Sequence, residues 1–196
     1  YALYLLSGIL PWGFFSLVTN LAMGSLLSNA GLVRKVYFAR ETLVFAQVIF
    51  SFVQFCIEMS LLCVALIIAG SPILPWIPVA FVMMLLLAVY ASGIALALAA
   101  SAVYFRDLRY LWTIIIQVMF FATPIIYPPD RLEGRLSRPL EILFAWNPMA
   151  VFVQSFRHLL YSGTSPEWRN LGYLTVVSCA TLVAGWFIFV GLSRRI

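Results

Sequence analysis

Long apolar runs divided by short charged gaps constrain this chain more than any other feature of its sequence. Of its 196 residues, 64% are hydrophobic and only 10% are charged, and the mean hydropathy is +1.03. Soluble domains carry about 25% charged and about 45–50% apolar residues. Most of this chain must therefore lie in lipid, and a water-soluble enzyme is excluded.

The apolar runs predict membrane-spanning helices. A helix that crosses a bilayer needs about 20 mostly apolar residues. Five segments satisfy or approach this length: 2–27, 43–69, 77–102, 111–127 and 171–192. The stretch SGILPWG predicts a kink in the first, and the fourth is short and runs into the proline-rich TPIIYPPD. The sequence thus predicts an all-α, polytopic helical bundle that forms one transmembrane domain.

The charged gaps predict which side of the membrane each loop occupies. If five spans alternate, the gaps at 28–42 and 103–110 and the C-terminus share one face, which carries seven basic and two acidic residues. The other face carries five basic and four acidic residues. Cytoplasmic loops carry an excess of Lys and Arg, so both gaps are predicted to be cytoplasmic. The basic residues sit at the ends of apolar runs, which indicates topology and not nucleic-acid binding.

This topology places Tyr1 on the outer side, with no basic region or cleavage site ahead of it. We therefore expect at least one further span before residue 1, which gives six spans and two cytoplasmic ends.

The segment 136–161 has apolar stretches too short and too broken to span the membrane. Pro139 can begin one helix, and Asn147-Pro148 ends it and begins a second over 149–161. This amphipathic pair either lies in, or dips into, the outer interface, or it forms an ordered lid over the span ends. The sequence does not separate these alternatives.

Glu58 is the only ionisable residue deep inside a predicted span, and Gln54 lies one turn before it. A lone acid near the bilayer centre is costly and faces protein or water. It either forms a hydrogen bond across a helix interface or lines a pathway. Aromatic rings can stack on sugar rings, so further pathway candidates are Tyr4, Trp12, Phe15, Phe120 and Tyr127. At a span end, an interfacial belt is the alternative role for Tyr127.

The sequence also lacks several catalytic patterns. It has no G-x-x-x-x-G-K-[ST] loop for ATP phosphates, and His158 is its only histidine, so we expect no cofactor, metal site or catalytic residue. The three cysteines are predicted to be apolar packing residues. The acids Asp130, Glu133 and Glu141 form either an external catalytic set or, interleaved with arginines, a solvated loop.

Four stretches together resemble a known family: LSGILPWGFFS, SNAGLVRKVYFARE, AVYFRDLRYLWTIIIQVMFFATPIIYP and NPMAVFVQSFRHLLYSG. In this order they resemble the membrane subunit of type-2 ABC exporters of O-antigen, capsule, teichoic acid and galactan. The likeness covers nearly the whole chain. One departure is Ala39, where the family often has proline, so the start of the second span is less sharply defined.

The resemblance implies a bacterial inner or plasma membrane permease that forms a homodimer, contacts membrane lipids and binds two cytoplasmic subunits that hold ATP and Mg. It implies a polyprenyl-pyrophosphate-linked glycan as the substrate, and an interface helix plus a first span before residue 1. The two gaps then match ATPase-coupling elements, whose candidates are Arg34, Lys35, Tyr37, Phe38, Arg40 and Glu41, with Tyr104, Phe105, Arg106, Asp107 and Arg109. The outer helix pair matches a gate, with Trp146, Asn147, Phe152, Phe156, Arg157 and His158.

Three alternatives remain at this stage. A drug or small-lipid exporter permease belongs to the same superfamily. A membrane-embedded glycan-modifying enzyme would use the outer loop. The aromatic and basic gaps would also serve as an anchor on anionic lipid.

Overall fold

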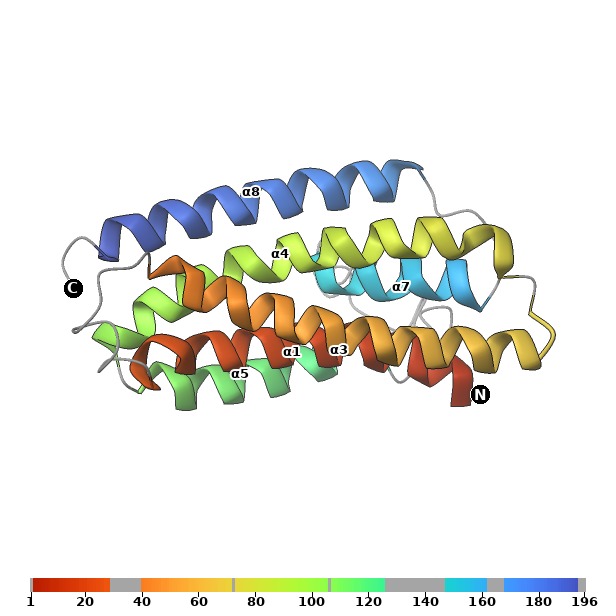
Figure 1. Ribbon diagram of the computed structural model, residues 1–196, viewed down its shortest axis with the longest axis horizontal. Coiled ribbons are helices and arrows are strands. Elements are labelled where there is room, and N and C mark those ends of the chain that lie inside the picture. The colour runs from red at the N-terminus through yellow and green to blue at the C-terminus, as the bar shows by residue number, and fades with distance from the viewer. Residues whose placement is uncertain are drawn as a thin grey trace, which may run out of the picture.

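The fold was analysed in a computed structural model that describes residues 2–28, 40–71, 73–105, 107–125, 147–161 and 168–193. Across these ranges the regular structure is helical and contains no strand, which confirms the predicted all-α class (Figure 1). The helices in chain order are α1 (Ala2–Ser28), α3 (Glu41–Ile68), η1 (Leu74–Trp76), α4 (Ile77–Tyr104), α5 (Leu108–Ala122), α7 (Pro148–Leu160) and α8 (Trp168–Ser193).

Four of the described helices are long and apolar enough to cross a membrane. They are α1, α3, α4 together with η1, and α8, and their bounds lie within three residues of the predicted spans. Pro11 lies inside α1, which continues as helix through the predicted kink site. Figure 1 shows these four helices extending along the long axis of the molecule.

The predicted fourth span, 111–127, is wrong in its bounds. The helix found there, α5, runs only from Leu108 to Ala122 and is 15 residues long. It stops because Thr123 precedes Pro124, and proline disfavours helical backbone in the residue before it. Thr123 is accordingly extended, with ψ 132°. In Figure 1, α5 covers only part of the long axis, and α7 occupies much of the remainder.

Helix α7 begins where the sequence predicted. The Asn147 side chain accepts a hydrogen bond from the Met149 backbone N–H at 3.1 Å, and Pro148 occupies the first helical position. Both are favourable at a helix N-terminus. Most side chains of α7 are buried, and the helix packs against α1, α4 and α8. Helix α7 therefore lies within the bundle, and its place at the outer interface or as a lid stays a prediction.

The closest approach of two helices is between α4 and α8. A Cβ added to Gly93 would overlap the Thr181 carbonyl group, and one added to Gly185 would overlap the Gly93 carbonyl group. In lipid, helix association depends on van der Waals packing, and small residues allow two backbones to approach closely. The absence of side chains at these two positions therefore sets the α4–α8 distance.

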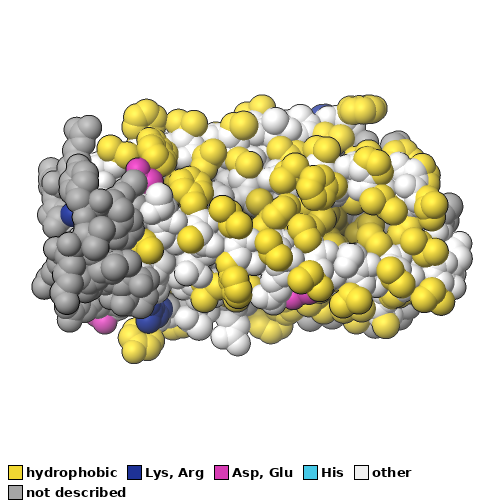
Figure 2. All heavy atoms as spheres, viewed as in Figure 1, with side chains coloured by type: hydrophobic (Ala, Val, Ile, Leu, Met, Phe, Trp, Pro, Cys, Tyr) yellow, Lys and Arg dark blue, Asp and Glu magenta, His cyan; other side chains and the backbone are white. Residues whose placement is uncertain are grey.

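The outward faces of the bundle are apolar. Large hydrophobic side chains cover much of the surface in Figure 2, and on α3 and α8 they include Ile49, Val53, Val176 and Phe187. Such a surface is stable only in contact with lipid or another apolar partner.

A matched pair of glycine substitutions tests the helix contact. We expect Gly185→Ala to lower the free energy of unfolding by about 1–3 kcal/mol, because the added methyl group meets backbone atoms of α4. Gly191 lies on the same helix with open space around it, so Gly191→Ala serves as the control. Unfolding of both variants in detergent gives the comparison, and an equal response would contradict the proposed contact.

Candidate functional site

The two charged gaps meet at one end of the bundle, which we call the coupling end. Arg40 Nη1 donates to the Ser193 carbonyl oxygen at 2.9 Å, and the Tyr104 hydroxyl donates to the Leu192 carbonyl oxygen at 2.9 Å. The last carbonyl groups of a helix lack intrahelical partners, and positive charge is favourable there. Arg40 from the first gap and Tyr104 from the second therefore both hold the end of α8. The described residues Arg40 and Tyr104 thus lie together beside the end of α8, and the membrane side that both gaps occupy stays a prediction.

Aromatic side chains project from the coupling end. Phe105 is 70% exposed and Tyr110 is 74% exposed, and Asp107 and Arg109 are exposed as well. Sequence reasoning missed Tyr110, although it is the last residue of the predicted second gap, in the run RDLRY.

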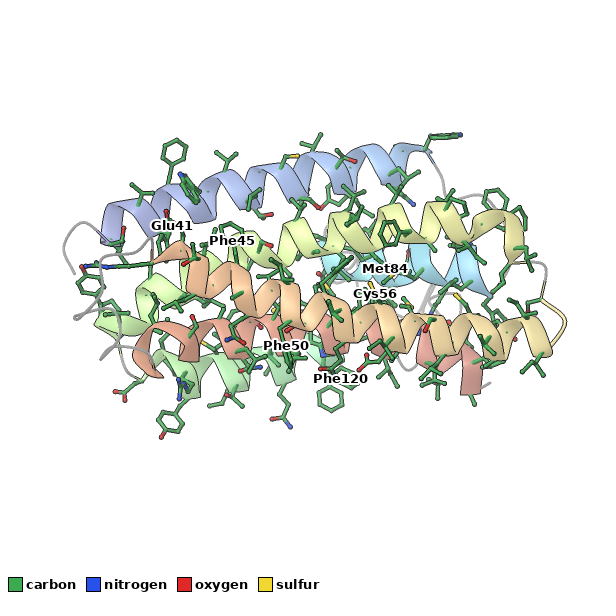
Figure 3. All side chains as sticks on the ribbon, viewed as in Figure 1. Glu41, Phe45, Phe50, Cys56, Met84 and Phe120 are labelled. Carbon is green, nitrogen blue, oxygen red and sulfur yellow. The ribbon has the colours of Figure 1, made fainter. Side chains whose placement is uncertain are left out.

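The other coupling candidates are placed less fully. Glu41 is the first residue of α3 and lies near the end of α8 (Figure 3). The side chains of Arg34, Lys35, Tyr37, Phe38 and Arg106 lie outside the described residues.

The predicted pathway aromatics lie mainly inside the chain. Trp12 packs against Phe120 of α5, with 5.8 Å between ring centroids, and against Phe15 at 5.9 Å. Phe15 is fully buried and stacks on Tyr90 of α4 at 5.8 Å. These rings join α1 to its neighbours within one chain, and their pathway role stays a prediction. Tyr127 is outside the described residues.

Two gate candidates belong to the same aromatic core. Phe152 contacts Tyr90 with 5.8 Å between ring centroids, and Phe156 contacts Phe55 of α3 at 6.4 Å. Sequence reasoning missed Tyr90 and Phe55, because no pattern in such apolar helices indicates which face is buried. Helix α7 thereby contacts both α3 and α4.

Arg157 is the most constrained polar residue of α7. Only 5% of its surface is exposed. Its Nη1 donates to the Pro124 carbonyl oxygen at 2.6 Å, and its Nη2 donates to the Ile125 carbonyl oxygen. The guanidinium carbon lies 4.2 Å from the centroid of the Tyr4 ring. A Cβ on Gly8 would lie 2.8 Å from Nη2, so glycine provides the space for this side chain.

The Arg157 contacts join two helices and one non-helical segment. They connect α7 to α1 through Tyr4 and to the segment after α5 through the two carbonyl groups. Asn147 adds a second link, since its Nδ2 donates to Thr123 Oγ1 at 3.3 Å. His158, in contrast, is exposed, and Trp146 lies outside the described residues. Polar contacts therefore fix α7 at both of its ends.

The external acids are not placed. Asp130, Glu133 and Glu141, the basis of the enzyme alternative, lie outside the described residues. Within the described ranges, no group of three or more His, Cys, Asp or Glu residues could hold a metal ion.

Comparison with known proteins finds sequence matches over most or all of the chain. Residues 2–161 match the family model described as ABC-2 type transporter. The whole chain is 26% identical to the O-antigen export system permease protein RfbA of Klebsiella pneumoniae and covers 74% of its length. It is 29% identical over 98% of the chain to the RfbA permease of Myxococcus xanthus, of which it covers 72%. The polysialic acid transport protein KpsM of Escherichia coli is 22% identical over 96% of the chain and 72% of that protein.

Substitution of Arg157 tests whether its contacts hold α7 to α1 and to the segment after α5. Arg157→Leu leaves the Pro124 and Ile125 carbonyl groups without these donors, so we expect unfolding to become easier by about 1.5–3 kcal/mol for each bond lost. Arg157→Lys should recover only part of this, because a lysine lacks the guanidinium fork. Tyr4→Phe keeps the ring and serves as the control for Tyr4→Leu, which removes the cation–π contact. Thermal unfolding in detergent provides the measurement. An Arg157→Leu variant as stable as the unsubstituted protein would contradict this role of Arg157.

Proposed function

Because this chain is a multi-pass bacterial membrane protein that belongs to the ABC-2 type transporter family, we propose that it is the membrane subunit of a polysaccharide exporter. One observation carries the proposal: relatives named for O-antigen export align with almost the whole chain, including both gaps and α7. The proposed cargo is a glycan linked to polyprenyl pyrophosphate. It moves from the cytoplasmic side to the outer side of the inner or plasma membrane.

The energy source in this proposal is a partner protein. The 196 residues contain no phosphate-binding G-x-x-x-x-G-K-[ST] loop. ATP and Mg would therefore be held by two separate cytoplasmic subunits that bind at the coupling end. Exposed Phe105 and Tyr110 suit such an interface, because aromatic residues are frequent binding hot spots. Asp107 and Arg109 would orient the partner through charge pairing.

The contacts at the coupling end suit the transfer of motion. A force applied to either gap acts also on the end of α8, because Arg40 and Tyr104 both bond its last carbonyl groups. Since α8 packs closely on α4 through Gly93 and Gly185, these elements would move together. We propose that this unit responds to the ATPases while α7 controls the outer opening.

A second copy of the chain completes the proposed transporter. Helix α5 buries only Ile116 within the chain, and its exposed apolar residues include Leu111, Ile114, Val118 and Phe121. A helix of 15 residues is also short for direct contact with the full lipid thickness. Both features favour a homodimer in which α5 faces the partner copy.

Substitutions at the coupling end test the ATPase partnership. We expect Phe105→Ala to weaken binding of the ATP-binding subunit by about 2 kcal/mol, roughly thirtyfold, if Phe105 is a hot spot. Asp107→Arg should leave the fold intact but reduce the amount of glycan that is exported. Trp168→Ala is the control, because Trp168 is 83% exposed at the start of α8, the end opposite to the coupling end.

Two measurements suffice for this test. Co-purification reports binding of the ATP-binding subunit, and surface glycan on intact cells reports export. Normal binding and normal export in both coupling-end variants would contradict the assignment of this surface. Surface glycan that is unaffected by loss of the whole chain would contradict the exporter itself.

A further inference from the structure

A polar hollow lies between α1 and α3, which run side by side in Figure 1. Its volume is about 210 Å³, several times the roughly 30 Å³ that one water molecule occupies in the liquid. The hollow therefore has room for a group much larger than a single water. Its walls are formed by Gly13, Phe14 and Leu17 of α1 and by Ser51, Gln54, Phe55 and Glu58 of α3.

The hollow lies near the middle of both helices. Gly13 is close to the midpoint of α1 (Ala2–Ser28), and Gln54 is close to the midpoint of α3 (Glu41–Ile68). Both helices are long and apolar enough to cross a membrane. A carboxyl group such as that of Glu58 is costly in hydrocarbon at this depth and faces protein or water. Lipid tails therefore do not suit the hollow.

The α3 wall presents hydrogen-bonding groups that the chain itself does not fully use. Gln54 Nε2 donates to Glu58 Oε1 at 2.9 Å, which holds the two side chains together. Among the described residues, neither Gln54 Oε1 nor Glu58 Oε2 accepts a further hydrogen bond. Ser51 is 1% exposed, and its Oγ has no partner in the described part of the chain. A buried hydroxyl group without a partner is costly, so this wall suits a ligand that both donates and accepts hydrogen bonds.

Apolar groups complete the hollow. Phe14 and Phe55 are buried and stack on each other, with 4.8 Å between ring centroids and 17° between ring planes. Leu17 adds an aliphatic side chain, and a Cβ on Gly13 would meet nothing within 4 Å. Apolar side chains beside hydroxyl, amide and carboxylate groups match the chemistry of a sugar ring. Such a ring has C–H groups on its faces and hydroxyl groups, which both donate and accept, at its edge.

We propose that the polar hollow is a contact site for one sugar unit of the exported glycan, an inference that rests on the proposed function. Glu58 and Gln54 accept hydrogen bonds from sugar hydroxyl groups, and the bond to the carboxylate is the stronger one because it is charge-assisted. Ser51 Oγ gains the partner that it lacks within the chain. The aromatic pair and Leu17 pack against the C–H face of the ring.

A site of this size suits a polymer that has to move on. Conduction requires binding that is favourable enough for entry and weak enough for release. The hollow holds a group of about one sugar ring, and Gln54 and Gly13 at its edge are exposed. Each unit of the glycan can therefore leave sideways and be replaced by the next.

Helix α1 connects the hollow with the face of α5 that is proposed to meet the second copy. Trp112 of α5 donates to Thr19 Oγ1 of α1 at 3.1 Å, while Phe14 packs on α3. Between these two contacts runs a less covered strip of α1, in which Gly13 is exposed and Ser16 and Asn20 are half-buried. A space enclosed by two copies that meet at α5 would extend along this strip to the hollow.

Photo-cross-linking in the full-length transporter, with its ATP-binding subunits and in native membranes, tests the proposal. A benzophenone side chain replaces Leu17, and cells that produce their own glycan are illuminated. Benzophenone reacts with nearby C–H groups, so a sugar unit in the hollow becomes attached to the protein. We expect a protein band of raised, heterogeneous mass that stains for carbohydrate after periodate oxidation.

The matched control places the same side chain at Val53. This residue is 55% exposed, precedes Gln54 on α3 and lies outside the hollow. The Val53 variant should show no carbohydrate.

Substitutions in the hollow give a second, independent readout. Gly13→Ala, Gly13→Leu and Gly13→Trp fill it progressively, and we expect surface glycan to fall stepwise, to a tenth or less with tryptophan. Gly172→Trp is the control, because Gly172 also has open space around it but lies on α8. Ser51→Ala should reduce the carbohydrate adduct about fivefold, the effect of one neutral hydrogen bond. Its stability in detergent should not fall, since the hydroxyl group has no partner among the described residues.

The other occupants of the hollow give different results. Attachment of the Leu17 probe to protein, to phospholipid or to nothing would overturn the proposal, as would equal carbohydrate on the Val53 variant. Failure of this inference is distinguishable from failure of the proposed function. If loss of the whole chain removes surface glycan while the Leu17 probe acquires no carbohydrate, the exporter stands and only the sugar site is wrong.

Discussion

A single constraint governs this fold: inside a bilayer, every backbone polar group needs a partner within the protein. Four described helices, whose backbone groups bond within each helix, are long and apolar enough to cross the apolar layer completely. Helix α5 is not, because Pro124 ends it early, and the next carbonyl groups would be left unpaired. Arg157 supplies the missing donors to Pro124 and Ile125 from α7. The broken fourth span is therefore possible because a cationic side chain from another helix is buried beside it.

The two ends of the bundle are held by different kinds of contact. At the coupling end, Arg40 and Tyr104 bond the last turn of α8, which itself packs on α4 through facing glycines. Toward the other end, α7 depends on aromatic packing and on the Arg157 contacts. Close backbone packing resists deformation, whereas a helix held by a few side chains can shift when those contacts are exchanged. This asymmetry fits the proposal that motion enters at one end and that the outer opening lies at the other.

The sequence predicted the spans and the shared end of the two gaps, because apolar length and charge bias act locally along the chain. The predicted end of α5 at residue 127 is too late. Apolar residues continue past Pro124, but the proline stops the helix at Ala122. The sequence could not predict that Phe15 is buried or that Tyr4 meets Arg157. Helices α1 and α4 are apolar on all sides, so no periodicity distinguishes a face toward protein from one toward lipid. The partner of a buried arginine depends on tertiary packing.

Two segments of the chain, VYFARE at 36–41 and VYFRD at 103–107, share Val-Tyr-Phe followed by an arginine and an acid. Each segment has one described residue that bonds the end of α8, Arg40 in the first and Tyr104 in the second. Because these two residues differ, their contacts with α8 do not explain why both segments share a tyrosine, a phenylalanine and an arginine. In the second segment, the Phe105 side chain is 70% exposed. Shared residues that packing within the chain does not require fit the proposed partner outside it. One ATP-binding subunit that faces both gaps would favour the same residues in each.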